Sequence, residues 1–385
     1  MYHKNPLSQR PSRLFFFIIF FTMAQACGSL PTKAPNSIKG PEIPNSSMSG
    51  IVINATGSWT SSSLYYYDVS SGGVALLSGG ESGDVYTAWL NDQLYVFNRG
   101  AGRVSYSTLK PRLGVRSRSV EKSIPGVDTF DPSFATTTFE GDLILSLNSK
   151  GSVVIANSET NDVIQEIRGI DKTKPEQRFR PDHILLSNTQ FFVAHQALDD
   201  SYGPNGSGVM FVGNKTSTGW NLDEQISISL TNPGYMKFIS EDQILVTGVC
   251  YSSENCQHGV ELIDVTRKIS RHLSSWDSEK WMANGGFYPD IKDGSLLACV
   301  AHLNGNSAKN ILGRYDIETG NITTLRELSG PGCGGIITDA AQKRIIVGEP
   351  TSLGGGVITV LSEDGTVLGQ AQVEIPIQGM TATFD

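Results

Sequence analysis

The tripeptide Val-Ala-His occurs twice, at 193–195 and 300–302, so that His195 and His302 end two similar strand-like segments. Two imidazoles facing one cleft could bind a metal ion or transfer protons near neutral pH. A structural interpretation competes, because a polar residue at a strand end commonly hydrogen-bonds the adjacent turn. We favour the structural interpretation, since the corresponding segment of another repeat ends in Gly248.

The Gly-rich stretch 196–208 carries two adjacent carboxylates, Asp199 and Asp200, followed by Tyr202. Carboxylate oxygens in a flexible loop could bind Ca²⁺, but the alternating Asp/Asn spacing of a dedicated calcium loop is absent. We therefore expect solvated loop residues. Arg178 and Arg180 lie just upstream and could meet an anionic partner, although an isolated pair is typical of an ordinary surface.

Aromatic residues and cysteines mark two further loops. Trp276 and Trp281 flank a polar stretch, where they either anchor a partner or pack between neighbouring repeats. Another loop holds Tyr251 and His258, and its two cysteines, Cys250 and Cys256, are close enough for a local disulfide. Cys299 and Cys333 then form the second pair by subtraction, although four cysteines allow three pairings.

Common catalytic and cofactor motifs are absent from the sequence. It contains no Gly-x-Ser-x-Gly, no His-Glu-x-x-His, no haem-attachment motif and no phosphate-binding Gly-x-x-x-x-Gly-Lys. We therefore assign no catalytic residue, no metal site and no cofactor from motifs alone.

The elements that must position these residues are short strands in a repeating pattern. A segment of the form apolar-x-apolar-x-Asp/Asn recurs seven times, starting at residues 64, 104, 153, 209, 260, 312 and 357. A period of about 40 to 50 residues with only strand-like content is typical of a β-propeller. The sequence predicts an all-β, seven-bladed propeller of four-stranded blades over residues 49–385.

The two ends of this domain are expected to share one blade. The strand-like segment 50–54 has a Pro-rich stretch before it and so lacks an inner partner, which the C-terminal segment 379–384 can supply. Such pairing closes the ring and removes exposed sheet edges. The longest connections (111–132, 168–181, 196–208, 251–259 and 274–285) then fall on one face, which we expect to be the binding face.

The repeats resemble those of the YVTN-type β-propellers, through Leu94-Tyr-Val-x-Asn98, 260–264 and Tyr315-Asp-Ile-Glu-Thr-Gly320. In that class the positions of His195 and His302 are usually Asn. The resemblance implies a seven-bladed fold whose members include binding proteins, scaffolds and, in related folds, lactonases. Fold likeness alone does not choose among these functions.

The N-terminal 26 residues have the features of an export signal. Lys4, Arg10 and Arg13 precede an apolar run, 14–23, that is too short to span a bilayer, and Ala24-Gln25-Ala26 offers a cleavage site. Cys27 directly after a small residue resembles the lipidation motif of bacterial lipoproteins, and a lipidated Cys27 leaves an even number of cysteines. The alternative is a soluble secreted protein.

Residues 27–48 then read as a lipidated cysteine and a Pro/Ser-rich tether. By the resemblance, Gly28 carries no inner-membrane retention signal, so the predicted location is the outer membrane of a bacterial envelope. Beyond residue 27 the chain has 27 basic and 38 acidic residues, a net charge of about −11. Such a surface repels nucleic acid.

These features lead to two main functional hypotheses, and a third, a quinoprotein-like redox subunit, ranks last because the sequence offers no cofactor ligands for it. The first is a monomeric, noncatalytic binding module or scaffold, held on the membrane by its lipid only, whose long-loop face binds an envelope protein or glycan. The second is a metal-dependent periplasmic or extracellular hydrolase or lactonase that uses the ring's central channel, with His183, His195, His302 and nearby Asp residues as ligands.

Overall fold

The computed structural model describes residues 48–384, apart from 59–60, 83–84, 99–104, 110–121, 126–131, 173–174, 188, 202, 249–256, 258, 276–280, 291–293, 305–306, 331 and 352–353. The described residues are all-β and contain no helix. No helix long and apolar enough to cross a membrane is therefore found among them. The export signal and the tether lie outside the described residues.

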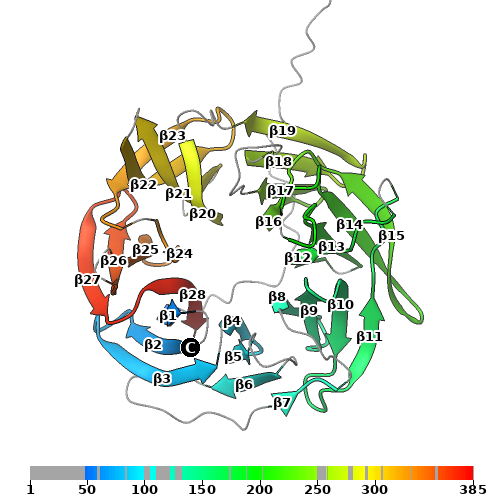
Figure 1. The fold of residues 1–385 in the computed structure, drawn as a ribbon, viewed down its shortest axis with the longest axis horizontal. Helices are drawn as coiled ribbons and strands as arrows, with labels where there is room; N and C mark the ends of the chain where they lie inside the picture. Colours follow the sequence, from blue (N-terminus) through cyan, green and yellow to red (C-terminus); the bar gives the residue numbers. More distant parts are fainter. Residues whose placement is uncertain are drawn as a thin grey trace, which may run out of the picture. The chain divides into compact units, whose positions relative to one another are not determined.

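Seven four-stranded antiparallel sheets follow one another around a ring, as Figure 1 shows, which confirms the predicted propeller. The innermost strands are β28 (Ile377–Phe384), β4 (Val85–Leu90), β8 (Pro132–Thr137), β12 (Pro181–Leu186), β16 (Pro233–Ser240), β20 (Trp281–Pro289) and β24 (Gly335–Asp339). The second strands are β1 (Met48–Ser58), β5 (Gln93–Asn98), β9 (Leu143–Leu147), β13 (Gln190–His195), β17 (Gln243–Gly248), β21 (Ser295–Asn304) and β25 (Arg344–Pro350).

The outer half of each blade is a further hairpin. The third strands are β2 (Ser61–Asp68), β6 (Ser105–Leu109), β10 (Ser152–Ala156), β14 (Val209–Thr216), β18 (Gly259–Asp264), β22 (Ser307–Asp316) and β26 (Gly356–Ser362). The outermost are β3 (Val74–Ser82), β7 (Lys122–Ser123), β11 (Val163–Ile167), β15 (Gly219–Ser227), β19 (Ile269–Ser275), β23 (Ile322–Glu327) and β27 (Val367–Val373). We number the blades 1 to 7 from the blade that contains β1.

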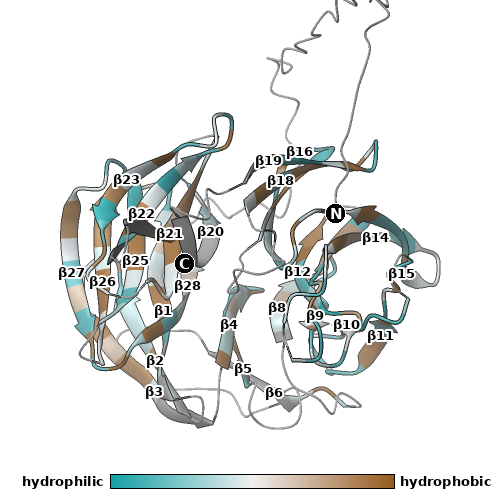
Figure 2. Ribbon diagram, turned by 45° about the horizontal axis from the view of Figure 1, so that its top comes forward, coloured by the Kyte–Doolittle hydropathy of each residue, from teal (hydrophilic) through white to brown (hydrophobic). Residues whose placement is uncertain are grey.

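The middle strands form because both of their faces are buried. Side chains alternate along a strand, so a strand packed on both sides reads as a continuous apolar run. In β13, Phe191 and Val193 pack against blade 3, whereas Phe192 and Ala194 pack against blade 5. Among the described residues, seven such hydrophobic clusters occur, one between each pair of neighbouring blades. Figure 2 shows hydrophobic stretches on strands all round the ring.

The ring is closed by strands from opposite ends of the chain, as the sequence predicts. The C-terminal strand β28 pairs with β1 and becomes the inner strand of blade 1 (Figure 1). Ile53 lies opposite Met380 in this register. The short turns between first and second strands lie at the other end from the long loops that join second to third strands and one blade to the next. An example of such a short turn is Asn91-Asp92, where both residues have positive φ, as a two-residue hairpin of type I′ requires. The prediction for 111–132 is wrong in part, because β7 divides this segment and residues 110–121 join β6 to β7, a connection that belongs to the short-turn end.

The predicted pair Cys299–Cys333 is a disulfide, with the Cα atoms 6.1 Å apart. It joins β21 of blade 6 to the segment that leads into blade 7, and the Cys299 side chain is fully buried. The other predicted pair, Cys250 and Cys256, lies outside the described residues.

Replacing Cys333 by Ser should destabilise the oxidised protein by about 3 to 4 kcal/mol, the value expected for closing a loop of this length. Urea unfolding of wild type and C333S under oxidising conditions measures this difference. In excess reductant the two proteins should become nearly equal, and an equally large difference in both conditions would contradict the prediction.

Candidate functional site

Three aromatic rings from successive blades meet at the inner edge of the ring. Phe134 of β8, His183 of β12 and Tyr235 of β16 lie near the start of their strands, at the end of the ring that carries the long loops. The His183 ring centroid is 4.0 Å from that of Phe134 and 5.4 Å from that of Tyr235. All three side chains are partly exposed. We call this group the axial arc.

Backbone irregularities occur at the same place in all three strands. The pairing of each inner strand with its neighbour shifts register between Pro132 and Phe134, between Pro181 and Ile184, and between Pro233 and Met236. A β-bulge of this kind inserts an extra residue and changes the direction of the side chains around it. In each strand the bulge follows a proline. It therefore helps to set the direction in which the side chain of the arc residue points.

The two polar members of the arc are neutral at physiological pH. Burial lowers the pKa of His183 to about 3, and burial raises the pKa of Tyr235 above its ordinary value. Neither side chain forms a hydrogen bond with any residue that the structure describes. The arc thus offers an imidazole nitrogen that can accept a proton and a phenol hydroxyl that keeps its own proton.

The shifted pKa of His183 predicts a pH-dependent loss of stability. Between pH 6.5 and about 3 the unfolded chain binds a proton at this residue that the folded chain does not. The free energy of unfolding should therefore fall on acidification through that range, by up to about 1.4 kcal/mol per pH unit from this group. Urea unfolding at pH 7, 6, 5 and 4 measures the slope. H183F should lack this contribution. If the free energy of unfolding depended on pH in the same way for the two proteins, the prediction would be refuted.

Arg180 is the centre of a buried hydrogen-bond network beside the arc. Its side chain is only 1% exposed. Nε donates to Leu198 O at 3.2 Å, Nη1 to Asn148 Oδ1 at 3.3 Å, and Nη2 to Asp199 O at 2.7 Å. Nη2 also pairs with Asp200 Oδ1 at 3.3 Å. The guanidinium thus fixes the loop 196–208 to the start of β12.

Further backbone bonds link this loop to its neighbours on the long-loop face. Ala197 N donates to Thr231 O at 2.9 Å, and Thr231 N donates to Gln257 O at 3.0 Å. Gln257 N in turn donates to Thr231 Oγ1 at 3.0 Å. The connections of blades 4 and 5 are therefore held together as one wall beside the arc.

Sequence-predicted residues of blade 4 are brought together, but their roles differ. His195 is buried, accepts a hydrogen bond at Nδ1 from Arg180 N at 2.9 Å, and packs against Phe179 and Phe211. Arg178 is exposed as expected. The expectation of an exposed Arg180 is wrong, because the loop carbonyls supply the acceptors that make its burial possible.

Asp199 and Asp200 are exposed, as expected for solvated loop residues. Asp199 Oδ1 accepts hydrogen bonds from Ser201 N and Gly203 N, both at 2.8 Å, so it stabilises its own turn. Tyr202, Tyr251, His258 and Trp276 lie outside the described residues. Trp281 and His302 are opposite each other in β20 and β21, so Trp281 begins an inner strand and not a loop, and their side chains are not described.

The three predicted metal ligands do not form a described cluster. His183 lies in the axial arc, whereas the Nδ1 atom of His195 is already bonded and its ring belongs to another aromatic group. Among the described residues no group of three His, Cys, Asp or Glu side chains is arranged to hold a metal ion.

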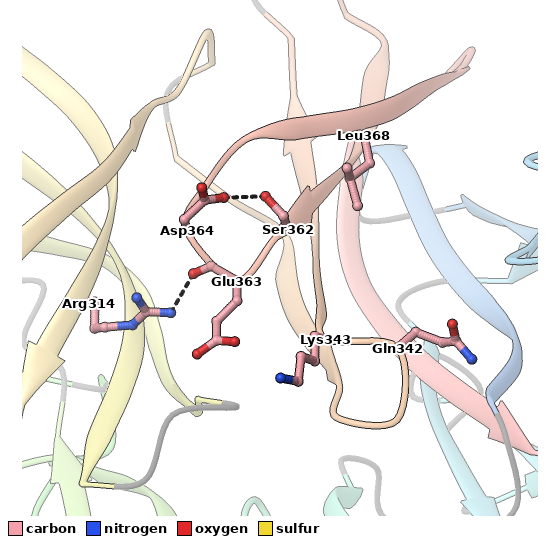
Figure 3. A pocket seen from close by; sticks show the side chains of 7 residues that line it. All are labelled: Arg314, Gln342, Lys343, Ser362, Glu363, Asp364 and Leu368. Atoms are coloured by element: carbon pink, nitrogen blue, oxygen red, sulfur yellow. Dashed lines mark hydrogen bonds between the residues drawn. The ribbon is translucent and has the colours of Figure 1, made fainter.

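A shallow pocket of about 590 Å³ opens between blades 6 and 7 on the opposite, short-turn face (Figure 3). Arg314 in this pocket pairs with Asp290 and donates to Glu363 O at 2.8 Å, and Ser362 bonds Asp364. Lys343 and the Glu363 carboxylate contribute charges of opposite sign. Because several of these polar groups are already hydrogen-bonded to one another, we place the candidate functional site at the axial arc.

Phe134, Tyr235 and Asn148 are site residues that the sequence analysis did not identify. A signal for two of them exists, since Pro132-Ser-Phe134, Pro181-Asp-His183 and Pro233-Gly-Tyr235 repeat the pattern Pro-x-ring at the start of three inner strands. The side-chain contacts of Asn148 depend on the loop 196–208 and have no comparable pattern.

The chain matches no protein-family profile and no curated protein sequence. Among solved structures it is similar to a putative 6-phosphogluconolactonase from Bacteroides fragilis, with a TM-score of 0.56, 11% identity, and coverage of 89% of this chain and 99% of that one. A periplasmic gluconolactonase from Pseudomonas aeruginosa matches with a TM-score of 0.58, 13% identity, and coverage of 87% and 98%.

The same fold is found in a Synechocystis apocarotenoid oxygenase, with a TM-score of 0.55, 9% identity, and coverage of 88% of this chain and 94% of that one. These likenesses show a propeller fold shared with lactonase-like proteins. At such low identity they show the fold alone, so function has to be argued from the site.

Proposed function

We propose that the protein is a hydrolase that opens a lactone ring at the axial arc. The observation that carries this proposal is the pairing of His183 and Tyr235 on neighbouring inner strands, with both groups neutral and neither bonded to a described residue. Ester hydrolysis needs a proton acceptor for the attacking water and a hydrogen-bond donor for the carbonyl oxygen.

The two side chains can meet both needs. Water attacks the lactone carbonyl carbon while the neutral imidazole of His183 accepts a proton from it. The hydroxyl of Tyr235 donates a hydrogen bond to the carbonyl oxygen as negative charge develops there. When the tetrahedral intermediate collapses, the bond to the ring oxygen breaks, and that oxygen takes the proton back from His183. The product is an open-chain hydroxy acid.

Two further observations support the proposal. Lactonase-named propellers match this chain along nearly their whole length, which makes the reaction compatible with the fold. The wall formed around Arg180 and Thr231 lies at the same end of the ring as the arc and would limit access of bulk water.

We further propose that the enzyme acts in the bacterial envelope as an outer-membrane lipoprotein attached through Cys27. The export signal, the cysteine and the Pro-rich tether of the sequence support this location. Metabolic labelling with a fatty-acid analogue should label the wild type and not C27S, and labelling of both proteins would overturn the proposal.

Acid release from glucono-1,5-lactone and a panel of γ- and δ-lactones tests the reaction on the full-length protein in detergent. We expect saturable turnover above the spontaneous rate for at least one lactone. Rates equal to buffer across the panel would overturn the proposal. Treatment with EDTA should leave turnover unchanged, whereas its loss would favour the metal-dependent version of the hypothesis.

A noncatalytic binding module is the second proposal, and the pKa of His183 favours it. A group with a pKa of about 3 is a weak base, because the efficiency of a general base falls as its pKa moves below the working pH. In that case the same arc would bind a sugar ring of an envelope glycan without turnover. Binding of a ring analogue with no hydrolysis of any lactone would favour this proposal over the first.

A further inference from the structure

We propose that Asn205 is a site of spontaneous conversion to isoaspartate, and that this modification loosens the wall beside the axial arc. Asn205 and Gly206 follow each other in the loop 196–208, and both residues are exposed. The inference goes beyond the proposed function, because it concerns a covalent change in the protein itself and not the reaction at the arc.

The Asn-Gly dipeptide is reactive because the following backbone nitrogen can attack the side-chain amide. Gly206 N loses its proton and bonds to Cγ of Asn205, while the bond from Cγ to Nδ2 breaks and ammonia leaves. Water then opens the five-membered imide, either at Cγ to give aspartate or at the backbone carbonyl carbon to give isoaspartate. Water is the only co-reactant, and nothing is oxidised or reduced. Glycine favours the attack, since it has no side chain beside the nitrogen.

The backbone of the loop leaves the attacking nitrogen available. Gly206 has a φ of 95°, a conformation that glycine adopts without steric cost. Its N–H forms no backbone hydrogen bond with a residue that the structure describes. Exposure of both residues also lets water reach the imide once it has formed.

Two other Asn-Gly pairs occur in the sequence, and the asparagine of each lies in a strand. Asn284 is within β20, and Asn304 ends β21 opposite Ser307. An extended backbone directs the next N–H sideways, toward a neighbouring strand and away from the side chain. We therefore expect Asn205 to react before the other two in the folded protein.

The chain is fixed on both sides of the reactive dipeptide. Asn205 N donates to Ala197 O at 2.8 Å. Gly208 N donates to Leu230 O at 2.7 Å, and Gly208 is so tightly packed that an added Cβ would lie 2.9 Å from Pro233 Cδ. Isoaspartate adds one carbon to the main chain between these two fixed points. Because only two residues separate them, the longer chain displaces at least one of the points.

Both fixed points belong to the wall. Ala197 N donates to Thr231 O at 2.9 Å, and Leu230 lies just before β16, the strand that carries Tyr235. The product also brings a new carboxylate to a loop that already carries Asp199 and its neighbouring acidic residue, and like charges repel one another. Modification in the loop should therefore weaken the hydrogen bonds that hold the wall at the start of β16.

Peptide mapping of the aged protein tests the modification. Full-length protein in detergent is held at mildly alkaline pH, digested, and analysed by mass spectrometry with electron-transfer fragmentation, which distinguishes isoaspartate from aspartate. We expect isoaspartate at residue 205 while Asn284 and Asn304 remain intact, whereas protein unfolded in urea should react at all three positions. An unmodified Asn205 in the folded protein, under conditions that convert it in urea, would overturn the inference, as would equal rates at the three positions.

Hydrogen exchange tests the effect on the wall. In the aged wild type, exchange of the amide of Ala197 or Gly208 should be about five- to tenfold faster than in fresh protein, the effect of weakening one hydrogen bond. N205Q is the matched control, because glutamine keeps the amide but would have to close a six-membered ring. Aged N205Q should match fresh protein. Unchanged exchange in the modified wild type would overturn the effect on the wall. Neither measurement uses lactone turnover, so their failure is distinct from failure of the proposed function.

Discussion

H183F should lower kcat/KM for the lactone that the wild type hydrolyses by a factor of roughly 10² to 10⁴, the range typical of a lost general base. Phenylalanine keeps an aromatic ring between Phe134 and Tyr235, so the stacking that surrounds His183 can persist. The loss should therefore fall on kcat and not on folding. Initial rates across substrate concentrations, with urea unfolding at pH 7 as the control for stability, measure both.

Removing the hydroxyl of Tyr235 distinguishes a catalytic role of this residue from a purely structural role of its ring. Y235F keeps the ring and removes only the donor proposed for the carbonyl oxygen, so kcat should fall by about 10² to 10³, the effect of deleting one such donor. We expect wild-type kcat/KM to fall on acidification with a midpoint near pH 3, because the imidazole of His183 must be neutral to accept the proton. An acid limb near pH 6.5, or full activity of H183F, would contradict the mechanism.

The fold was predictable because the repeats bury both faces of their middle strands. Once neighbouring blades cover a strand on both sides, segments such as 191–195 must be continuously apolar, and that pattern is visible without a structure. Ring closure was predictable for a related reason. Segment 50–54 had no inner partner upstream, and only the C-terminal segment could supply one.

The site was less accessible, because it is made by contacts between blades. His183 and Tyr235 are 52 residues apart, and their rings meet only because β12 and β16 are neighbours at the inner edge of the ring. The sequence also fails to predict the difference in burial between Arg178 and Arg180, although they are only two residues apart. In an extended strand, residues two apart face the same side. The segment that holds this pair precedes β12 and is not a strand, so one arginine is exposed and the other is buried.

The different burial of these two arginines leads to a second prediction with a large expected effect, this time on the free energy of unfolding. R180A should reduce the free energy of unfolding by about 3 kcal/mol, because several buried acceptors lose their donor at once. R178A removes the same charge from an exposed side chain and should change stability by less than about 0.5 kcal/mol. Urea unfolding of the three proteins at pH 7 gives both values.

The same pair also tests whether the Arg180 network serves the site as well as the fold. The guanidinium holds the loop 196–208 through Leu198 O and Asp199 O. The backbone N of Arg180, directly before the strand β12 that carries His183, donates to His195 Nδ1 at the end of β13. R180K keeps a charge but not the planar fork, so it should recover part of the stability and less of the activity. If R180A lost stability but kept wild-type kcat and KM, the network would support only the fold. A rise in KM at unchanged kcat would indicate that the loop it holds contacts the bound ring.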